Sequence, residues 1–227
     1  MDGLKVLGYT LAEVLITLGI IGIIAALTIP QLTVNYQKKE AATKLEYTYS
    51  LLAQAILLSE KDNGFENEWE LDKSEPSDVK ITEKFVKTYI EPYIKTIKKD
   101  EYTNSSANYD YFYRKNEKLE KVHGHTHYSI ALNNGIYLHF NANFGVSNTI
   151  GVRVDTNGMK KPNVVGKDTF EIYFYPKLKT KASDVNNRNT LLNLCKSNTS
   201  NALNDQLTGC SALIQHDGWQ INKDYPW

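Results

Sequence analysis

The sequence predicts an α+β fold, in which one long N-terminal helix packs on an antiparallel β-sheet of about four strands. Three observations lead to this prediction. Residues 11–29 are almost purely apolar, and a helical pattern resumes beyond Pro30. Short β-rich segments separated by turn residues follow in the second half of the chain. Two cysteines stand close to the C-terminus and fit an exported domain.

The apolar segment contains a single charge, Glu13. At about 1.5 Å per residue, a helix over residues 11–29 spans roughly 28 Å, which is close to the hydrocarbon thickness of a bilayer. A carboxylate near the start of a membrane span costs on the order of 3 kcal/mol even on lenient scales. Glu13 is therefore expected to have a partner or a specific role.

After Pro30 the apolar residues step by three or four and share one helical face. The residues of this stripe are Ala42, Leu45, Tyr49, Leu52 and Ile56. The pair Asn63-Gly64 is a typical helix stop signal. The sequence thus predicts one helix from Tyr9 to about Asp62, with an amphipathic second half that packs on the sheet.

A second short helix is expected over residues 81–90, ending near Pro92. The strand-like segments are residues 109–113, 128–132, 136–140, 150–155 and 170–175. Asn133-Asn134-Gly135 predicts a hairpin turn between two of them. The mixed charges of residues 114–121 predict an exposed hairpin tip. The Asn-, Ser- and Thr-rich region from Ala182 onward leads into the cysteine-containing loop.

Composition limits the function classes. The 227 residues carry 26 basic and 26 acidic side chains, and this balance does not favour nucleic acid as a general partner. The mean hydropathy is −0.43 despite the apolar segment, so the remainder is polar. The sequence contains no GxxxxGK, GxSxG, HExxH or CxxC motif. We therefore expect that the protein is not an enzyme. No motif identifies a cofactor with certainty, and Ca²⁺ is considered below.

Cys195 and Cys210 are the two cysteines. In an exported domain they are expected to form one disulfide, which would contribute roughly 3 kcal/mol by closing its loop. The alternative is two free buried thiols in a cytoplasmic protein.

Two groups of side chains are candidate metal ligands. Asp155, Asn157 and Asp168 provide oxygen atoms that suit Ca²⁺, although the segment fails the EF-hand pattern. The alternative is an Asx-rich turn whose side chains bond to their own backbone. His123, His125 and His127 would share one face of a strand and could bind Zn²⁺ or another transition metal. The alternative is an incidental surface cluster.

The N-terminal segment resembles the class III signal and first helix of type IV pilins and type II secretion pseudopilins. That family has a short leader ending in Gly, an aromatic residue, then Thr-Leu-Ile-Glu, with a proline further along. The matching residues here are Gly8, Tyr9, Thr10, Leu11, Glu13 and Pro30. Tyr9 stands in place of the usual Phe and Ala12 in place of the usual Ile.

The resemblance implies that a prepilin peptidase cleaves after Gly8 and N-methylates Tyr9. Glu13 would then pair with the Tyr9 amine of a neighbouring subunit and set the axial register. It also implies a C-terminal disulfide loop and a segment order that runs from leader to extracytoplasmic head. The segments are a leader at 1–8, a transmembrane or filament-core helix at 9–30, an amphipathic continuation at 31–63 and a pilin-like domain at 64–227.

The expected location is the inner membrane before assembly, as a single-pass protein with its C-terminal domain outside the cytoplasm, and an extracytoplasmic filament afterwards. The expected partners are identical or related pilin subunits, the prepilin peptidase, the inner-membrane assembly platform and membrane lipid. Nucleic acid is expected as a partner only if the protein has a role in DNA uptake. Pilus and secretion pseudopilus share the motif, so both stay open. The alternative function is a membrane-tethered minor pilin or binding module, an adhesin or a ligand- or metal-binding tip, that forms no homopolymer.

Overall fold

The computed structural model describes residues 8–70, 79–97, 109–122, 127–143, 149–158, 160–175, 177–180, 182 and 184–227. The chain divides into two compact units, residues 1–38 and residues 39–227. Helix α1 (Leu11–Asn63) contributes to both units, and every other element belongs to the second. The α+β class predicted from the sequence is confirmed.

Helix α1 begins and ends where its local sequence dictates. Its N-terminus follows Thr10, and its C-terminus is closed by Gly64, whose φ of 80° is left-handed and whose N–H donates to Glu60 O at 3.0 Å. The helix continues through Pro30. Because proline has no backbone N–H, the carbonyl of Ala26 loses the hydrogen bond that a regular helix would give it.

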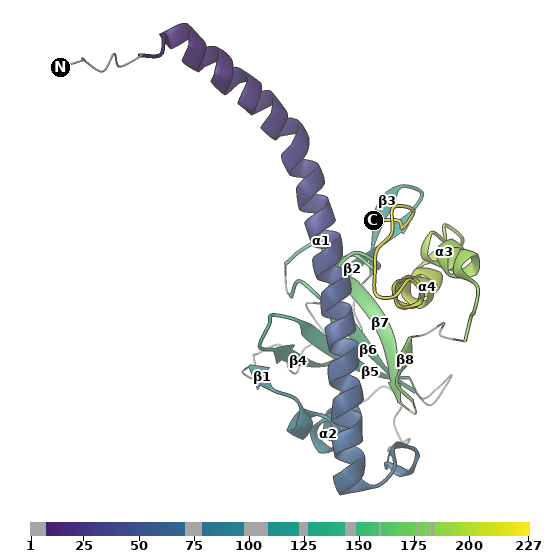
Figure 1. Cartoon of the computed structure of the whole chain (residues 1–227). Coiled ribbons are helices and arrows are strands. Elements are labelled where there is room, and N and C mark those ends of the chain that lie inside the picture. Colours follow the sequence, from purple (N-terminus) through teal and green to yellow (C-terminus); the bar gives the residue numbers. More distant parts are fainter. Residues whose placement is uncertain are drawn as a thin grey trace, which may run out of the picture. The chain divides into compact units, whose positions relative to one another are not determined.

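In the second unit, α1 buries the apolar stripe expected from the sequence. Leu45 and Leu52 are completely buried and Tyr49 is half-buried. They join one hydrophobic core with helix α2 (Val79–Tyr89) and with the inward residues of the sheet, such as Leu138 and Phe140. Figure 1 shows the C-terminal part of α1 and helix α2 lying against the sheet.

The main sheet is antiparallel and has six strands in the order β1-β4-β5-β6-β7-β8. Four strands form its body: β4 (Tyr128–Leu132), β5 (Tyr137–Asn143), β6 (Thr149–Asp155) and β7 (Thr169–Tyr175). The edges are two-residue strands, β1 (Thr96–Ile97) and β8 (Lys179–Thr180). The prediction of about four strands thus captured the body of the sheet and omitted its short edges.

The β4–β5 hairpin forms at the predicted turn. Gly135 has a φ of 80°, and Leu132 pairs with Ile136 through an N–H···O bond of 2.8 Å. A left-handed φ is a conformation that glycine adopts without steric cost, so this sequence favours the tight connection.

The predicted strand at residues 109–113 was misplaced. Strand β2 covers Tyr111–Lys115 and pairs with β3 (Lys118–Val122) in a separate two-stranded sheet. The segment predicted as an exposed tip is mostly the two arms of this hairpin, which turns at Asn116 and Glu117 with φ of 50° and 62°. The hairpin joins the body of the unit through Phe112, whose backbone bridges to Val164.

The region expected to be a loop around the cysteines is helical. Helix α3 (Arg188–Cys195) and helix α4 (Ala202–His216) pack on each other, and α4 contacts β7, β8 and β2. The remaining elements are two short 3-10 helices, η1 (Glu66–Glu68) and η2 (Glu91–Tyr93). Two residues outside any helix or strand separate η2 from β1.

Candidate functional site

The N-terminal motif forms a capping box at the start of α1. The backbone N–H and the hydroxyl of Thr10 both donate to Glu13 Oε2, each at 2.8 Å. In return, Glu13 N–H donates to Thr10 Oγ1 at 3.3 Å. This reciprocal arrangement satisfies N–H groups that a helix start leaves without partners. Sequence reasoning gave Glu13 an intermolecular role and missed this local one, although Thr-x-x-Glu is itself a recognised capping pattern.

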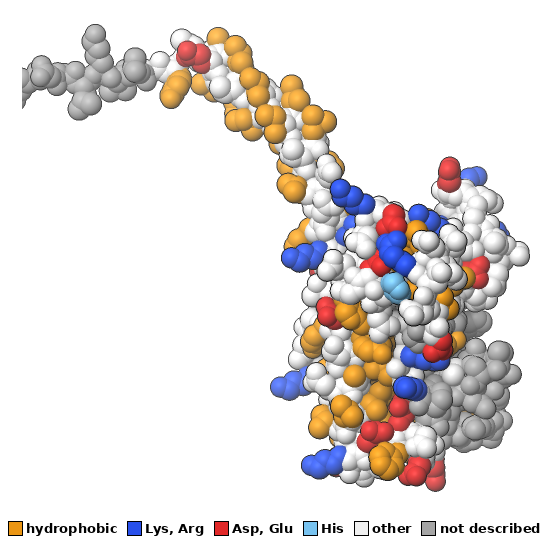
Figure 2. All heavy atoms as spheres, turned by 45° about the vertical axis from the view of Figure 1, so that its right-hand side comes forward, with side chains coloured by type: hydrophobic (Ala, Val, Ile, Leu, Met, Phe, Trp, Pro, Cys, Tyr) orange, Lys and Arg blue, Asp and Glu red, His pale blue; other side chains and the backbone are white. Residues whose placement is uncertain are grey.

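No residue in the apolar half of α1 is buried, and all except the partly exposed Ala25 are exposed. An 18-residue window within the helix has a mean hydropathy of 2.3, and none of that window is buried. By length and composition the helix can cross a membrane. Figure 2 shows hydrophobic side chains coating this part of α1.

The few polar groups in the apolar half are bonded within the helix. Thr17 Oγ1 donates to Val14 O, and Thr28 Oγ1 donates to Ile24 O, both at 2.9 Å. Polar groups inside a membrane need hydrogen-bond partners within the protein, because lipid chains offer none. The half of α1 that carries the motif is therefore suited to an apolar environment.

The structure brings Asp155, Asn157 and Asp168 together at the end of β6. Asn157 N–H donates to Asp155 Oδ1 at 3.1 Å, and Asn157 Nδ2 donates to Asp168 Oδ2 at 3.2 Å. Asp168 Oδ1 also accepts from Val164 N–H at 2.5 Å. The Asp155–Asn157 bond is an Asx-type turn, which is the alternative considered for this segment.

Burial is the main influence on the pKa values of Asp155 and Asp168. Asp155 is completely buried, and burial together with the nearby Asp168 carboxylate raises the pKa of Asp155 to about 8. Burial also raises the pKa of Asp168 to about 6. At neutral pH the pair therefore favours a proton on Asp155.

A cation could replace that proton. Asp155 Oδ2 and Asn157 Oδ1 have no hydrogen-bond donor within the described part of the chain. The described residues contain no group of three or more His, Cys, Asp and Glu side chains arranged to hold a metal ion. Binding of Ca²⁺ at Asp155, Asn157 and Asp168 stays a prediction.

The predicted histidine cluster lies partly outside the described residues, because His123 and His125 fall there. His127 is described and buried, and its ring lies 6.1 Å from that of His139 on β5. His139 Nδ1 is 2.7 Å from Ser129 Oγ, and burial holds the pKa of His139 well below its usual value. His139 is thus a neutral group at pH 7 and belongs to the interior.

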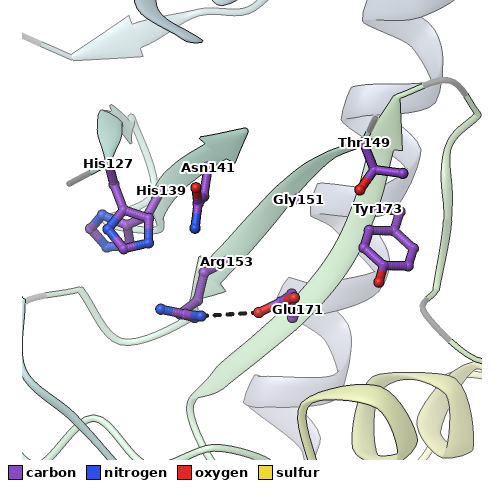
Figure 3. Close-up of a pocket in the computed structure, with 8 residues that line it drawn as sticks. All are labelled: His127, His139, Asn141, Thr149, Gly151, Arg153, Glu171 and Tyr173. Carbon is purple, nitrogen blue, oxygen red and sulfur yellow. Dashed lines mark hydrogen bonds and ion pairs between the residues drawn. The ribbon is translucent and has the colours of Figure 1, made fainter. Parts of the chain in front are cut away.

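His127 and His139 line a cavity of about 50 Å³ on the polar side of the sheet (Figure 3). Arg153 on β6 lines it as well and forms a 3.0 Å ion pair with Glu171 on β7. The guanidinium of Arg153 also stacks on the Tyr111 ring at 4.0 Å. The sequence analysis did not predict that His139, Arg153 and Glu171 line one cavity. The alternation of Arg153 and Glu171 with apolar neighbours was the available signal, since it places them on one face of adjacent strands.

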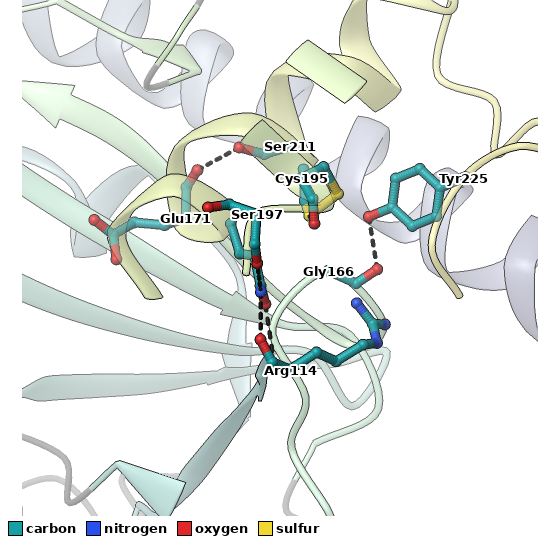
Figure 4. Close-up of a disulfide and its surroundings, with 9 residues drawn as sticks. Arg114, Gly166, Glu171, Cys195, Ser197, Ser211 and Tyr225 are labelled. Atoms are coloured by element: carbon teal, nitrogen blue, oxygen red, sulfur yellow. Dashed lines mark hydrogen bonds between the residues drawn. A yellow bond between two sulfur atoms is a disulfide. The ribbon is translucent and has the colours of Figure 1, made fainter. Parts of the chain in front are cut away.

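Cys195 and Cys210 form the expected disulfide, which ties α3 to α4. Gly166 packs directly beside it: a side-chain carbon at this position would lie 2.6 Å from Cys210 Sγ. Tyr225 near the C-terminus donates its hydroxyl to Gly166 O at 2.6 Å (Figure 4). The disulfide, the 164–169 turn and the C-terminal segment therefore form one packed region.

Residues 31–227 match a family of unknown function, DUF6613. The chain belongs to this family. The match begins just after Pro30, so the N-terminal motif and the apolar half of α1 lie outside it. No curated protein matches the chain, and no solved structure does.

Proposed function

We propose that this protein is a structural subunit of a type IV pilus or of a type II secretion pseudopilus. The observation that carries the proposal is the N-terminal segment. It combines Gly8-Tyr9-Thr10-Leu11-Ala12-Glu13 with a continuous apolar helix that passes through Pro30 and has no buried residue in its most apolar window. A pilin-like order of elements follows, in which the same helix continues into an α+β head with a C-terminal disulfide.

Cleavage after Gly8 would give Tyr9 a new α-amino group, whose ordinary pKa near 8 makes it largely cationic at neutral pH. Glu13 is the only charged side chain nearby in the apolar half of α1. The capping box uses Oε2 of Glu13, and a carboxylate has further acceptor sites on its second oxygen. Oε1 can therefore accept from the Tyr9 amine of a neighbouring subunit while the cap remains in place.

In this proposal the protein is stored in the inner membrane with its head outside the cytoplasm. The prepilin peptidase processes it, and the inner-membrane platform lifts it into a filament. The partners are other pilin subunits, and lipid surrounds α1 before assembly. Because an unpaired charge in an apolar filament core is costly, the Glu13–Tyr9 pair would fix the axial register.

Variants at Thr10 and Glu13 separate the intermolecular role of Glu13 from its role as a cap. Glu13→Gln keeps an acceptor for the cap and removes the charge, whereas Thr10→Ala weakens the cap and keeps the charge. If the charge pair drives assembly, Glu13→Gln and Glu13→Ala should each lower the yield of sheared filaments by roughly tenfold or more. Thr10→Ala should assemble nearly as well as the wild type.

The assay compares sheared filaments from cells that carry the cognate assembly system, with the total amount of subunit measured in parallel. Wild-type filament yield from Glu13→Gln would overturn the pairing role and leave Glu13 as a helix cap alone.

A second candidate function is a membrane-tethered minor pilin or binding module. The cavity in Figure 3 favours it, because a purely structural subunit has no need for a buried polar cavity lined by Arg153 and His139. Long homopolymers of the purified protein would argue against this candidate.

A further inference from the structure

The chain after α4, residues 217–227, contains neither helix nor strand, yet it is anchored at several points of the second unit. Trp219 turns the chain out of α4 with a left-handed φ of 59°, and the centre of its ring lies 5.3 Å from that of Tyr49 on α1. Ile221 packs against the hydrophobic core. We call the residues that follow, 222–227, the C-terminal strap.

Arg188, the first residue of α3, holds the strap through an ion pair. Its Nη1 and Nη2 donate to the two carboxylate oxygens of Asp224 at 2.7 and 2.9 Å. Its Nε and Nη2 donate to Asp217, directly after α4, at 2.7 and 2.8 Å. The Arg188 guanidinium lowers the pKa of Asp224 to about 2, so this pair is fully charged at neutral pH. Two-point bonds to a planar guanidinium fix direction as well as distance, so Arg188 sets the path of the strap.

Tyr225 is the buried residue of the strap. It is 4% exposed, whereas the three residues before it are exposed. Its hydroxyl donates to Gly166 O at 2.6 Å. A side-chain carbon at Gly166 would lie 2.6 Å from Cys210 Sγ and 3.2 Å from the Tyr225 hydroxyl oxygen, so the strap and the disulfide meet at this glycine. Figure 4 shows the Tyr225 ring beside the disulfide of Cys195.

The disulfide is covered on this side. Cys195 and Cys210 are each 1% exposed. Pro226 of the strap and Cys195 line the same surface pocket, so the strap is part of the wall between this cysteine and solvent. The 164–169 turn forms another part of the cover, and Tyr225 holds that turn through Gly166. Because thiol–disulfide exchange requires a thiolate to reach a sulfur atom, a covered disulfide reacts only when its cover moves away.

We propose that the C-terminal strap closes over the disulfide after it has formed and shields it from thiols. Formation needs the disulfide of an exchange partner as oxidant, which takes two electrons and two protons from the two thiols and becomes a dithiol. The reverse reaction needs a dithiol to reach the same sulfur atoms, and the closed strap prevents this. Closure therefore makes the disulfide resistant to reduction. The inference does not depend on filament assembly.

Reduction of the disulfide under native conditions tests the strap. The detergent-solubilised full chain is incubated with excess dithiothreitol, and free thiols are followed over time by alkylation and mass spectrometry. The wild type should be reduced slowly, because the strap must open first. A chain that ends at Ile221 lacks the strap and should be reduced roughly tenfold faster or more. Equal rates for the two chains would overturn the proposal.

Arg188→Gln weakens the hold on the strap without removing any residue. Asp224 loses its partner, so the strap should open more often and reduction should be faster by roughly threefold or more. Lys179→Gln is the matched control, since it removes a surface ion pair with Asp184 on another part of the second unit. It should keep the wild-type rate. If the chain that ends at Ile221 fails to fold, a wild-type rate in Arg188→Gln overturns the proposal by itself.

The dependence on urea separates opening of the strap from unfolding of the whole unit. Opening of the strap exposes little surface, so the reduction rate of Arg188→Gln should change little with urea below the unfolding transition. A rate that rises with urea as steeply as global unfolding would mean that the disulfide reacts only in the unfolded chain. The strap would then not be its shield.

Discussion

The buried carboxyl group of Asp155 makes the stability of the fold depend on pH. Its pKa in the folded chain is raised to about 8, and that of Asp168 to about 6, so the folded state binds protons more tightly than the unfolded chain. A group with a raised folded pKa stabilises the fold below its ordinary pKa, and that stabilisation is lost as the pH rises through the folded value. The relevant window for Asp155 is about pH 4 to 8.

His139 acts in the opposite direction within part of this window. Burial lowers its pKa, so folding favours the neutral ring, and stability from this group rises with pH up to its ordinary pKa near 6.5. The total pH dependence of the wild type therefore mixes the two contributions. The difference between the wild type and a variant at position 155 cancels the His139 contribution and leaves that of Asp155 together with its effect on the neighbouring Asp168.

Asp155→Asn should become progressively more stable relative to the wild type as the pH rises from about 4 to 8. The amide cannot ionise, so the cost of charging the buried carboxyl disappears. The difference in free energy of unfolding can grow by up to about 1.4 kcal/mol per pH unit. Denaturant unfolding at several pH values measures it.

Asp184→Asn is the control for this pH series, because the Asp184 side chain is 83% exposed and pairs with Lys179 at the surface. It should show almost no pH-dependent difference. Parallel curves for Asp155→Asn and the wild type would mean that Asp155 is ionised in the folded chain at neutral pH.

At the scale of elements, the packing of α3 on α4 depends on a glycine. A side-chain carbon at Gly209 would lie 2.5 Å from Leu194 Cβ and 2.7 Å from Cys195 N. Both contacts are far shorter than van der Waals contact, and the second involves backbone that cannot move aside. The two helices approach closely only because position 209 has no side chain.

Gly209→Ala should therefore destabilise the head by about 1–3 kcal/mol, despite the better helix propensity of alanine. Gly151→Ala is the matched control, since its added carbon meets atoms no nearer than 3.8 Å and its φ lies outside the left-handed region. Denaturant unfolding of both variants gives the comparison. A Gly209→Ala variant as stable as Gly151→Ala would contradict the close packing of α3 and α4.

For the whole molecule, the sequence predicted features that local chemistry determines. The apolar run, the 3.6-residue stripe ending at Asn63-Gly64 and the Asn-Asn-Gly turn each predicted an element that the structure contains. The disulfide was predicted from the number of cysteines on the expectation that the domain is exported, and the structure contains it.

Features that depend on tertiary contacts were missed. Helix α4 has apolar residues at helical spacing, but the polar segment before it suggested a loop. Tyr111 looked like part of the main sheet, because aromatic strand propensity does not identify the pairing partner. Arg114 on β2 exchanges two hydrogen bonds with Gln206 on α4, and these residues are 92 positions apart in sequence, so only the fold brings them together.

The most direct test of the central claim is the N-terminal peptide of the membrane-extracted protein, determined by mass spectrometry. The proposal predicts a chain that begins at Tyr9 and carries one added methyl group, which leaves the amine cationic and able to pair with Glu13. A chain that still begins at Met1 would leave Glu13 without that partner and would contradict assembly by prepilin processing. A chain that begins beyond Pro30 would contradict the role of α1 altogether.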